Sequence, residues 1–307
     1  MKRYLVTGGA GFVGSHLVDY LLSRGHTVRV LDNFSTGKRE RIPNGVEIVE
    51  ADIRDQKAIA SAFVGVDGVF HLAALPSVQV SLEHPEETHA VNVTGTVNVL
   101  LASRDARVPR IVYAASCAAY GDQATLPCHE GMTPHPNTPY ALQKYIGEQY
   151  VQLFSTCYGL QTVALRFFNI YGPQLPFHGA YASVIGIFLK QQSSGQALTI
   201  TGDGKQTRDF VYVEDIVRAL LAAMESPHVG TGEVINIGSG VETSVNAVAD
   251  LFGGQREYIA PRVELRAIRA NIDRANTLLG WSPEISFADG MQRTMEWFAR
   301  AMPSQRP

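Results

Sequence analysis

The first half of the chain alternates short apolar runs with longer segments whose apolar residues recur every three or four positions. Val13, Leu17 and Leu21 share one face of such a helix, and Gly25 follows where a C-terminal cap is expected. The short β-rich runs predict strands at residues 4–6, 28–31, 46–49, 69–72 and 111–114. Strands alternating with helices indicate a doubly wound parallel sheet, so we expect an α/β fold.

The second half continues this pattern and then loosens after Gly172 and Pro173. Further elements are predicted as helices at residues 88–104, 140–158 and 213–226 and as strands at 162–167 and 234–237. We interpret the looser region as a smaller, interleaved C-terminal α/β substrate domain. The expected division is 1–172 mainly in the first domain and 173–307 mainly in the second, with 213–240 returning to the first.

The composition of the 307 residues excludes several classes of partner. A formal net charge of -3 and a pI of about 6.3 offer no basic excess for nucleic acid or anionic lipid. No uncharged apolar run approaches the roughly 20 residues needed to span a bilayer. The three cysteines cannot all pair, and neither they nor His129 and His135 show metal-ligand spacing. We therefore expect a cytoplasmic protein with no metal, no membrane and no nucleic acid partner.

A glycine-rich turn stands between the first predicted strand and the first helix, where Gly8, Gly11 and Gly14 form G-x-x-G-x-x-G. Glycines there permit a tight turn and the close approach of a pyrophosphate. The amides of the helix N-terminus, at Phe12 and Val13, supply an anion site. Strand, turn, helix and second strand follow in the required order, which predicts a Rossmann dinucleotide-binding sheet.

Asp32 ends the second predicted strand, where its carboxylate can accept hydrogen bonds from the adenosine ribose hydroxyls. The same charge repels a 2′-phosphate and favours NAD, although Lys38 and Arg39 nearby leave NADP open. Asn33 is a further expected cofactor contact. The alternative is that Asp32 only begins a turn with Asn33.

Asp52 and Ile53 follow the third predicted strand and are expected adenine contacts. An equal alternative for Asp52 is that it caps the next helix.

A candidate reaction centre lies further along the chain. Tyr140 and Lys144 are four residues apart on one predicted helix, so their side chains share a face, and Pro139 suits the first turn of that helix. An adjacent ammonium can favour the phenolate of a tyrosine and fit it for general-base chemistry. Ser116, just after the fifth strand, can hydrogen-bond a substrate oxygen in a reaction that passes through a ketone.

With these residues the chain resembles the extended short-chain dehydrogenases and, within them, the sugar-nucleotide enzymes similar to UDP-glucose 4-epimerase. The resemblance covers almost the whole sequence. It rests on residues 7–14, His71-Leu72-Ala73-Ala74, Ser116 with Tyr120-Gly121-Asp122, Tyr140 to Lys144, Arg166-Phe167-Phe168-Asn169 and Arg208-Asp209-Phe210.

The resemblance implies a role for each matching residue. Tyr140 would be the base, Lys144 would also hold the nicotinamide ribose, and Ser116 would orient the sugar oxygen. Further implied cofactor contacts are Leu72, Ala73, Ala74 and Asn92. Implied substrate contacts are Ser77, Ser81, Asn169, Arg208 and Arg262, with arginine suited to phosphate oxygens.

Two of these assignments have structural alternatives. Arg208 could instead form an ion pair with Asp209 or Asp215. Arg262 could belong to a solvated loop.

The reaction is narrowed by two residues that follow Ser116. Related dehydratases and decarboxylases carry acids there, whereas this chain has Cys117 and Ala118. The resemblance therefore implies a UDP-sugar 4-epimerase with tightly bound NAD and a 4-keto intermediate. Another NAD-dependent nucleotide-sugar enzyme, such as a UDP-glucuronate epimerase or dehydratase, and a noncatalytic dinucleotide-sensing protein remain as alternatives.

The substrate and the assembly are further expectations from the resemblance. Ile268 falls where a bulky tyrosine restricts some epimerases to sugars without an N-acetyl group, so UDP-N-acetylglucosamine and UDP-N-acetylgalactosamine are expected alongside UDP-glucose and UDP-galactose. Core packing of Ile268 is an equal alternative. The helices near residues 88 and 140 are expected to pair in a homodimer, although their apolar faces could be used within one chain.

Overall fold

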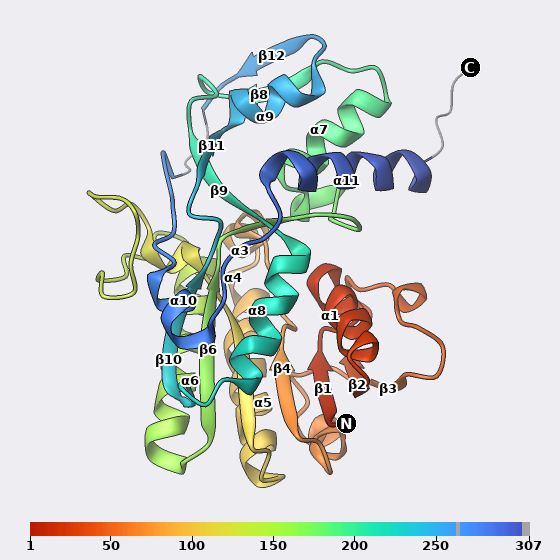
Figure 1. Cartoon of the computed structure of the whole chain (residues 1–307), viewed down its shortest axis with the longest axis vertical. Coiled ribbons are helices and arrows are strands. Elements are labelled where there is room, and N and C mark those ends of the chain that lie inside the picture. The colour runs from red at the N-terminus through yellow and green to blue at the C-terminus, as the bar shows by residue number, and fades with distance from the viewer. Residues whose placement is uncertain (262–264, 303–307) are drawn as a thin grey trace.

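The computed structural model describes residues 1–261 and 265–302, and its main feature is a seven-stranded parallel sheet (Figure 1). In spatial order the strands are β10 (Thr231–Ile237), β6 (Gln161–Phe167), β5 (Arg110–Ser116), β4 (Gly68–His71), β1 (Arg3–Thr7), β2 (Thr27–Asp32) and β3 (Glu47–Glu50). Every neighbouring pair is parallel. All the strands predicted from the sequence lie in this sheet, with ends displaced by up to three residues, which confirms the α/β expectation.

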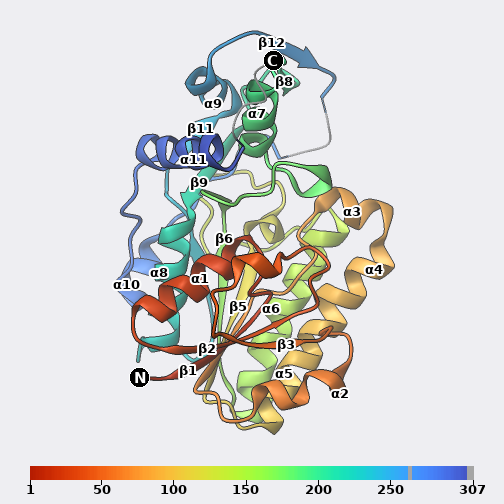
Figure 2. The same cartoon turned by 90° about the vertical axis from the view of Figure 1, so that its right-hand side faces the viewer.

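Helices cover both faces of the sheet, because side chains alternate along each strand. On β1, Tyr4 and Val6 join one core cluster and Leu5 joins the cluster on the opposite face. The covering helices are α1 (Phe12–Ser23) and α8 (Val213–Glu225) on one face and α2 (Gln56–Ile59), α5 (Thr96–Asp105) and α6 (Pro139–Tyr158) on the other. Figure 2 shows the two layers on either side of the strands.

The helix predicted at residues 88–104 differs in detail from the one observed. It begins earlier, as α4 (Pro85–His89), passes through the π-helical turn η3 (Ala90–Gly95) and continues as α5. Inside the π-helical turn the carboxamide of Asn92 binds the backbone of Leu75. Such turns are frequent at functional sites, and hydrophobic periodicity alone does not reveal them.

A smaller lobe lies beyond the carboxyl ends of the main strands, at the top of Figure 1. Its elements are β7 (Asn169–Tyr171), β9 (Thr207–Tyr212) and β11 (Glu242–Ser244) in one sheet, β8 (Leu198–Thr201) and β12 (Arg256–Ile259) in another, and α7 (Val184–Ser193), α9 (Val245–Phe252) and α11 (Phe287–Ala301). A separate apolar cluster around Phe188 and Val248 forms its core. The chain returns from this lobe to the main sheet at β10, which pairs with β6.

The topology points to one place for a ligand. The order of the strands reverses between β1 and β4, and in open α/β sheets ligands bind outside the carboxyl ends at such a point. The small lobe faces the same end.

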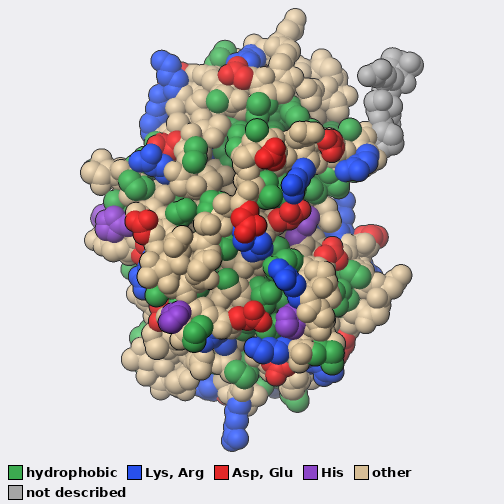
Figure 3. All heavy atoms as spheres, viewed as in Figure 1, with side chains coloured by type: hydrophobic (Ala, Val, Ile, Leu, Met, Phe, Trp, Pro, Cys, Tyr) green, Lys and Arg blue, Asp and Glu red, His purple; other side chains and the backbone are tan. Residues whose placement is uncertain are grey.

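None of the helices in the described ranges is long and apolar enough to cross a membrane. Figure 3 shows basic and acidic side chains interspersed over the face in view, without a continuous basic area.

Candidate active site

The glycine-rich turn packs its backbone too closely for side chains at two of its positions. A β-carbon on Gly14 would lie 2.1 Å from the carbonyl oxygen of Gly8, and one on Gly8 would lie 2.7 Å from the amide nitrogen of Ala73. Gly8 also has a φ of 71°, which favours glycine. Gly11 caps α1 without a side-chain oxygen, so Phe12 and Val13 begin the helix with their amides directed to this turn.

The end of β4 completes the same edge. The amide of Leu72 donates to the carbonyl of Thr7 at 3.1 Å, and Leu72, Ala73 and Ala74 are all half-buried beside the glycines. These residues and the glycine-rich turn therefore form one continuous border at the point where the strand order reverses.

Asp32 combines the two interpretations drawn from the sequence. Its carboxylate is buried and accepts hydrogen bonds from the amides of Ala10, at 2.9 Å, and Phe34, at 2.8 Å. The bond from Phe34 closes a turn, which is the alternative role predicted for Asp32. The bond from Ala10 connects the carboxylate to the glycine-rich turn. A carboxylate has about four acceptor positions, so ribose hydroxyls can still bind.

Arg39, one of the two basic residues that left NADP open, is engaged by other groups. The guanidinium of Arg39 stacks on Phe34 at 4.2 Å and forms an ion pair with Glu50. Glu50 is the register partner of Asp32, so two carboxylates stand at this corner. The arrangement favours NAD.

Asp52 does not cap the next helix, because the cap of α2 is Asp55. Hydrogen bonds from Arg54 hold the pKa of the Asp52 carboxyl down at about 2, and Asn33 donates to it at 2.8 Å. Ile53 is buried against Gly95 of the π-helical turn.

A series of side-chain hydrogen bonds that the sequence did not predict lies beneath this border. Thr96 donates its hydroxyl proton to the carbonyl of Asn92 at 2.7 Å, so its oxygen must accept from Nε2 of His71, 3.0 Å away. Nδ1 of His71 then accepts from the hydroxyl of Thr7 at 2.8 Å, and Thr7 accepts from the amide of Ala73. Burial, reinforced by Lys144, lowers the pKa of His71 to about 3, so the imidazole is neutral.

Asn92 connects the loop after β4 to α6. Its carboxamide accepts from the amide of Leu75 at 2.8 Å and donates to Gln143 of α6 at 2.9 Å. The residue expected to contact the cofactor thus holds the loop after β4 against the helix that carries Tyr140.

Ser116, Tyr140 and Lys144 meet at the end of β5. Burial raises the pKa of Tyr140 to about 12, while a side-chain hydrogen bond with Ser116 acts in the opposite direction. Lys144 is buried, its Nζ donates to the carbonyl of Ala114 at 2.6 Å, and burial lowers its pKa to about 7. From the sequence we expected a lowered pKa of the phenol, but the removal of both groups from water dominates.

Ser116 keeps its hydroxyl proton available. Its Oγ accepts a hydrogen bond from the amide of Ala118 at 3.2 Å and caps the short helix η4 (Cys117–Tyr120). In that helix, burial raises the pKa of Cys117 to about 12, so its thiol is not an activated nucleophile.

On the substrate side, Asn169 and Arg208 lie on the neighbouring strands β7 and β9. The Oδ1 atom of Asn169 is buried without a hydrogen-bond partner in residues 1–261 and 265–302, as expected of a group that awaits a ligand donor. Arg208 donates to the carbonyl of Thr207 at 2.8 Å. Arg262 lies outside the described residues.

Asp209 and Asp215, the two alternative ion-pair partners considered for Arg208, interact with other groups. Asp215 pairs with Arg218 at 2.8 Å. Asp209 accepts from the amides of Ser239, Gly240 and Ala270.

Two serines expected at the substrate are engaged within the protein. Ser77 caps α3 (Val78–Glu83) by accepting from the amide of Val80. The hydroxyl of Ser81 donates to the carbonyl of Val78 and accepts from the amide of Tyr140.

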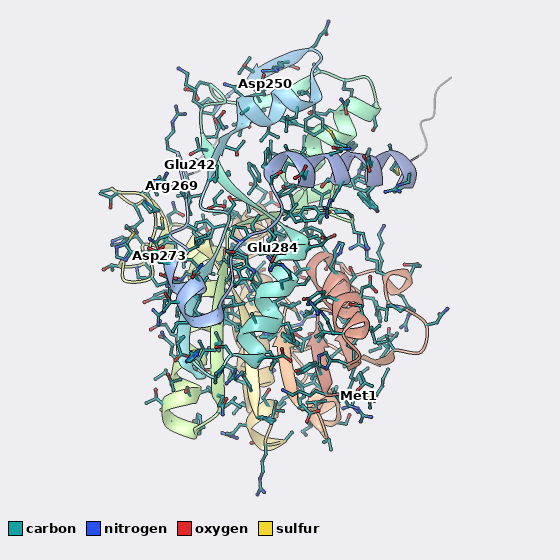
Figure 4. The ribbon with its side chains drawn as sticks, in the orientation of Figure 1. Met1, Glu242, Asp250, Arg269, Asp273 and Glu284 are labelled. Atoms are coloured by element: carbon teal, nitrogen blue, oxygen red, sulfur yellow. The ribbon has the colours of Figure 1, made fainter. Side chains whose placement is uncertain are left out.

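Ile268 is 2% exposed and belongs to the large core cluster, in agreement with its packing alternative. Its neighbour Arg269 approaches Glu242 of β11, with 3.8 Å between Nε and Oε2 (Figure 4). This segment therefore lies against the sheet that carries Arg208.

Comparisons with known proteins agree with this geometry. The NAD dependent epimerase/dehydratase family matches residues 4–238. The UDP-glucose 4-epimerase of Mycolicibacterium smegmatis is 38% identical over 96% of this chain and 98% of its own. A UDP-N-acetyl-alpha-D-glucosaminuronate decarboxylase of Bacillus cytotoxicus is 34% identical over 97% and 98%.

Two solved structures are similar throughout. The UDP-glucose 4-epimerase of Thermotoga maritima, crystallised with UDP-glucose, has a TM-score of 0.93 and 36% identity, and 98% of this chain and 99% of that chain are covered. The UDP-N-acetylglucosamine 4-epimerase of Methanobrevibacter ruminantium, in complex with UDP-N-acetylmuramic acid, has a TM-score of 0.92 and 32% identity over 98% and 99%. With its glycine-rich border, Asp32 and the group around Tyr140, this chain belongs to the NAD-dependent epimerase/dehydratase family and is an NAD-dependent enzyme.

Proposed function

We propose that this enzyme inverts C4 of a UDP-linked sugar. The observation that carries the proposal is the meeting of Ser116, Tyr140 and Lys144 at the end of β5, with alanine at 118 in place of an acid. These groups suit the oxidation and reduction of an alcohol, and an elimination or a decarboxylation would need the missing carboxyl group. Relatives named as an epimerase and as a decarboxylase support the assignment to nucleotide-sugar enzymes. They do not distinguish the two reactions, so the choice between them rests on the residues around Ser116.

The residues divide the work. Tyr140 takes the proton of the 4-hydroxyl group and later returns it, while Ser116 holds the same oxygen through its free hydroxyl proton. NAD supplies the hydride acceptor and donor, so the cycle needs no second redox substrate. The resulting 4-keto sugar turns over and is reduced on its opposite face. Asn169 and Arg208 hold the nucleotide so that the sugar can turn.

The experiment is incubation of the enzyme with UDP-glucose, UDP-N-acetylglucosamine and UDP-glucuronate, followed by NMR of the products. We expect conversion to the C4 epimer of a neutral sugar without release of NADH. A 4-keto-6-deoxy product would identify a dehydratase, and C4 inversion of UDP-glucuronate alone would identify a UDP-glucuronate epimerase. No conversion of any of the three sugars would refute the proposal.

Tyr140→Phe should retain NAD and UDP-sugar binding and lose turnover by about 10²-fold or more, because the ring stays and the ionisable oxygen goes. Turnover is measured by product NMR, and binding by calorimetry. Near-normal turnover would exclude Tyr140 as the base.

We infer further that N-acetylated sugars are accepted. An isoleucine at 268 lacks the length of a phenol, and the similarity to a UDP-N-acetylglucosamine 4-epimerase supports the wider pocket. Ile268→Tyr should depress turnover of UDP-N-acetylglucosamine about tenfold more than that of UDP-glucose. Ile268→Leu, which keeps the volume, is the control for core damage. Equal losses with both sugars would exclude this gate.

We also propose a homodimer. Leu142 and Leu153 of α6 and Leu82 of the adjacent α3 are each about half exposed, although they are large and apolar. Figure 2 shows these helices on the same side of the sheet. Apolar side chains gathered on neighbouring helices are typical of an interface.

The unpaired state of all three cysteines fits the reducing cytoplasm.

A further inference from the structure

Ser81 makes two hydrogen bonds that connect α3 to the first turn of α6. Its fully buried hydroxyl donates to the carbonyl of Val78 at 2.7 Å and accepts from the amide of Tyr140 at 3.0 Å. We propose that Ser81 is a positioning residue, which holds the backbone of Tyr140 and so the place of its phenol. The proposal rests on the proposed function, since it assigns Ser81 to the same reaction, and it replaces a direct contact with substrate.

The start of α6 explains why this bond matters. Pro139 has no amide proton, and the amide of Ala141 is capped by the hydroxyl of Thr138 at 3.2 Å. The amide of Leu142 begins the regular ladder by donating to the carbonyl of Thr138. The amide of Tyr140 therefore has no partner within this turn, and an oxygen from another helix accepts its hydrogen bond.

Fixing this amide fixes the reacting oxygen. The phenol projects from the same residue, and Ser116 at the end of β5 opposes the rise in its pKa that burial causes. Proton transfer requires the two oxygens to lie within hydrogen-bond reach, and a displacement of about 1 Å can lower a rate on the order of 10²-fold. Without the Ser81 oxygen, the first turn of α6 has a buried donor to satisfy and is free to shift.

The test compares Ser81→Ala with Ser103→Ala. Ser103 is also a fully buried serine in a helix, but its hydroxyl donates only to the carbonyl of Val99, away from the reaction centre. We expect kcat of Ser81→Ala to fall about 10- to 10²-fold with an unchanged KM and NAD content, and the kinetic pKa of the phenol to rise as its bond to Ser116 loosens. Ser103→Ala should keep its kcat, and Ser81→Thr, which retains the hydroxyl, should restore most of it.

Amide hydrogen exchange gives a readout independent of activity. The peptide that contains Tyr140 should exchange faster in Ser81→Ala than in the parent or in Ser103→Ala. Unchanged kcat, equal losses in both alanine variants, or unchanged exchange at Tyr140 would each overturn the proposal. If the parent enzyme converts no UDP-sugar, the proposed function fails, and the exchange measurement still decides whether Ser81 holds Tyr140.

Discussion

Lys144 is a positive charge held almost entirely away from water. Its Nζ lies 4.8 Å from the centre of the Tyr113 ring and, within residues 1–261 and 265–302, donates to the carbonyl of Ala114 alone. Neither partner is an anion, so the ammonium is poorly compensated when the chain stands alone. Lys144 is therefore a residue kept for function at a cost in stability, as is common at reaction centres.

This cost should depend on pH. Burial lowers the pKa of Lys144 from 10.5 to about 7 in the folded chain. Below pH 7 both states are protonated and the full cost is present. Between pH 7 and 10.5 only the unfolded state keeps the proton, so stability rises with pH. In protein freed of NAD, the stability advantage of Lys144→Met should fall by about 3 kcal/mol between pH 6 and pH 9, at about 1.4 kcal/mol for each pH unit above 7.

Urea denaturation at the two pH values measures this difference. The control is Lys190→Met, at an exposed lysine of α7, whose effect should not change with pH. A pH-independent effect of Lys144→Met would show that its ammonium is stabilised in the folded chain.

Among the elements, the turn between β1 and α1 has no room for added volume at Gly14. Gly14→Ala would place a carbon 2.1 Å from the carbonyl oxygen of Gly8, which is backbone and cannot swing aside. The turn must then open, at a cost of about 1–3 kcal/mol, and the pyrophosphate site opens with it. NAD content after purification should fall at least several-fold, as measured by chromatography of the released nucleotide.

Gly131→Ala is the matched control, because its added carbon would lie 3.2 Å from the side chain of His129 and not from backbone. NAD content should stay at the level of the parent. Full retention of NAD in Gly14→Ala would mean that the turn does not bind the pyrophosphate.

At this scale the sequence was most informative where a pattern is local. Strand alternation and glycine spacing predicted the sheet and its border, and the i, i+4 spacing put Tyr140 and Lys144 on one helical face. The series of hydrogen bonds through Thr7, His71 and Thr96 could not be predicted in this way, because each bond joins residues from separate elements. The resemblance placed Ser81 at the substrate, and only the packing of α3 on α6 shows that its oxygen accepts from the amide of Tyr140.

The assembly is a property of the whole molecule. If the exposed apolar side chains of α3 and α6 form the contact between two copies, a charge there must leave water on association. Leu153→Glu should therefore yield a monomer by light scattering, whereas the parent is a dimer. Leu251→Glu, at a similarly exposed leucine of α9 in the small lobe, should leave the mass unchanged. A dimer that persists in Leu153→Glu would place the contact elsewhere.

The return of the chain to β10 also affects how the protein is made. β6 is complete at Phe167, but its outer partner begins only at Thr231, after β7, α7, β8, β9 and α8. During translation the nascent chain therefore presents an open sheet edge at β6 for as long as the intervening residues take to emerge from the ribosome. Open edges pair readily with other chains, so this interval carries a risk of aggregation.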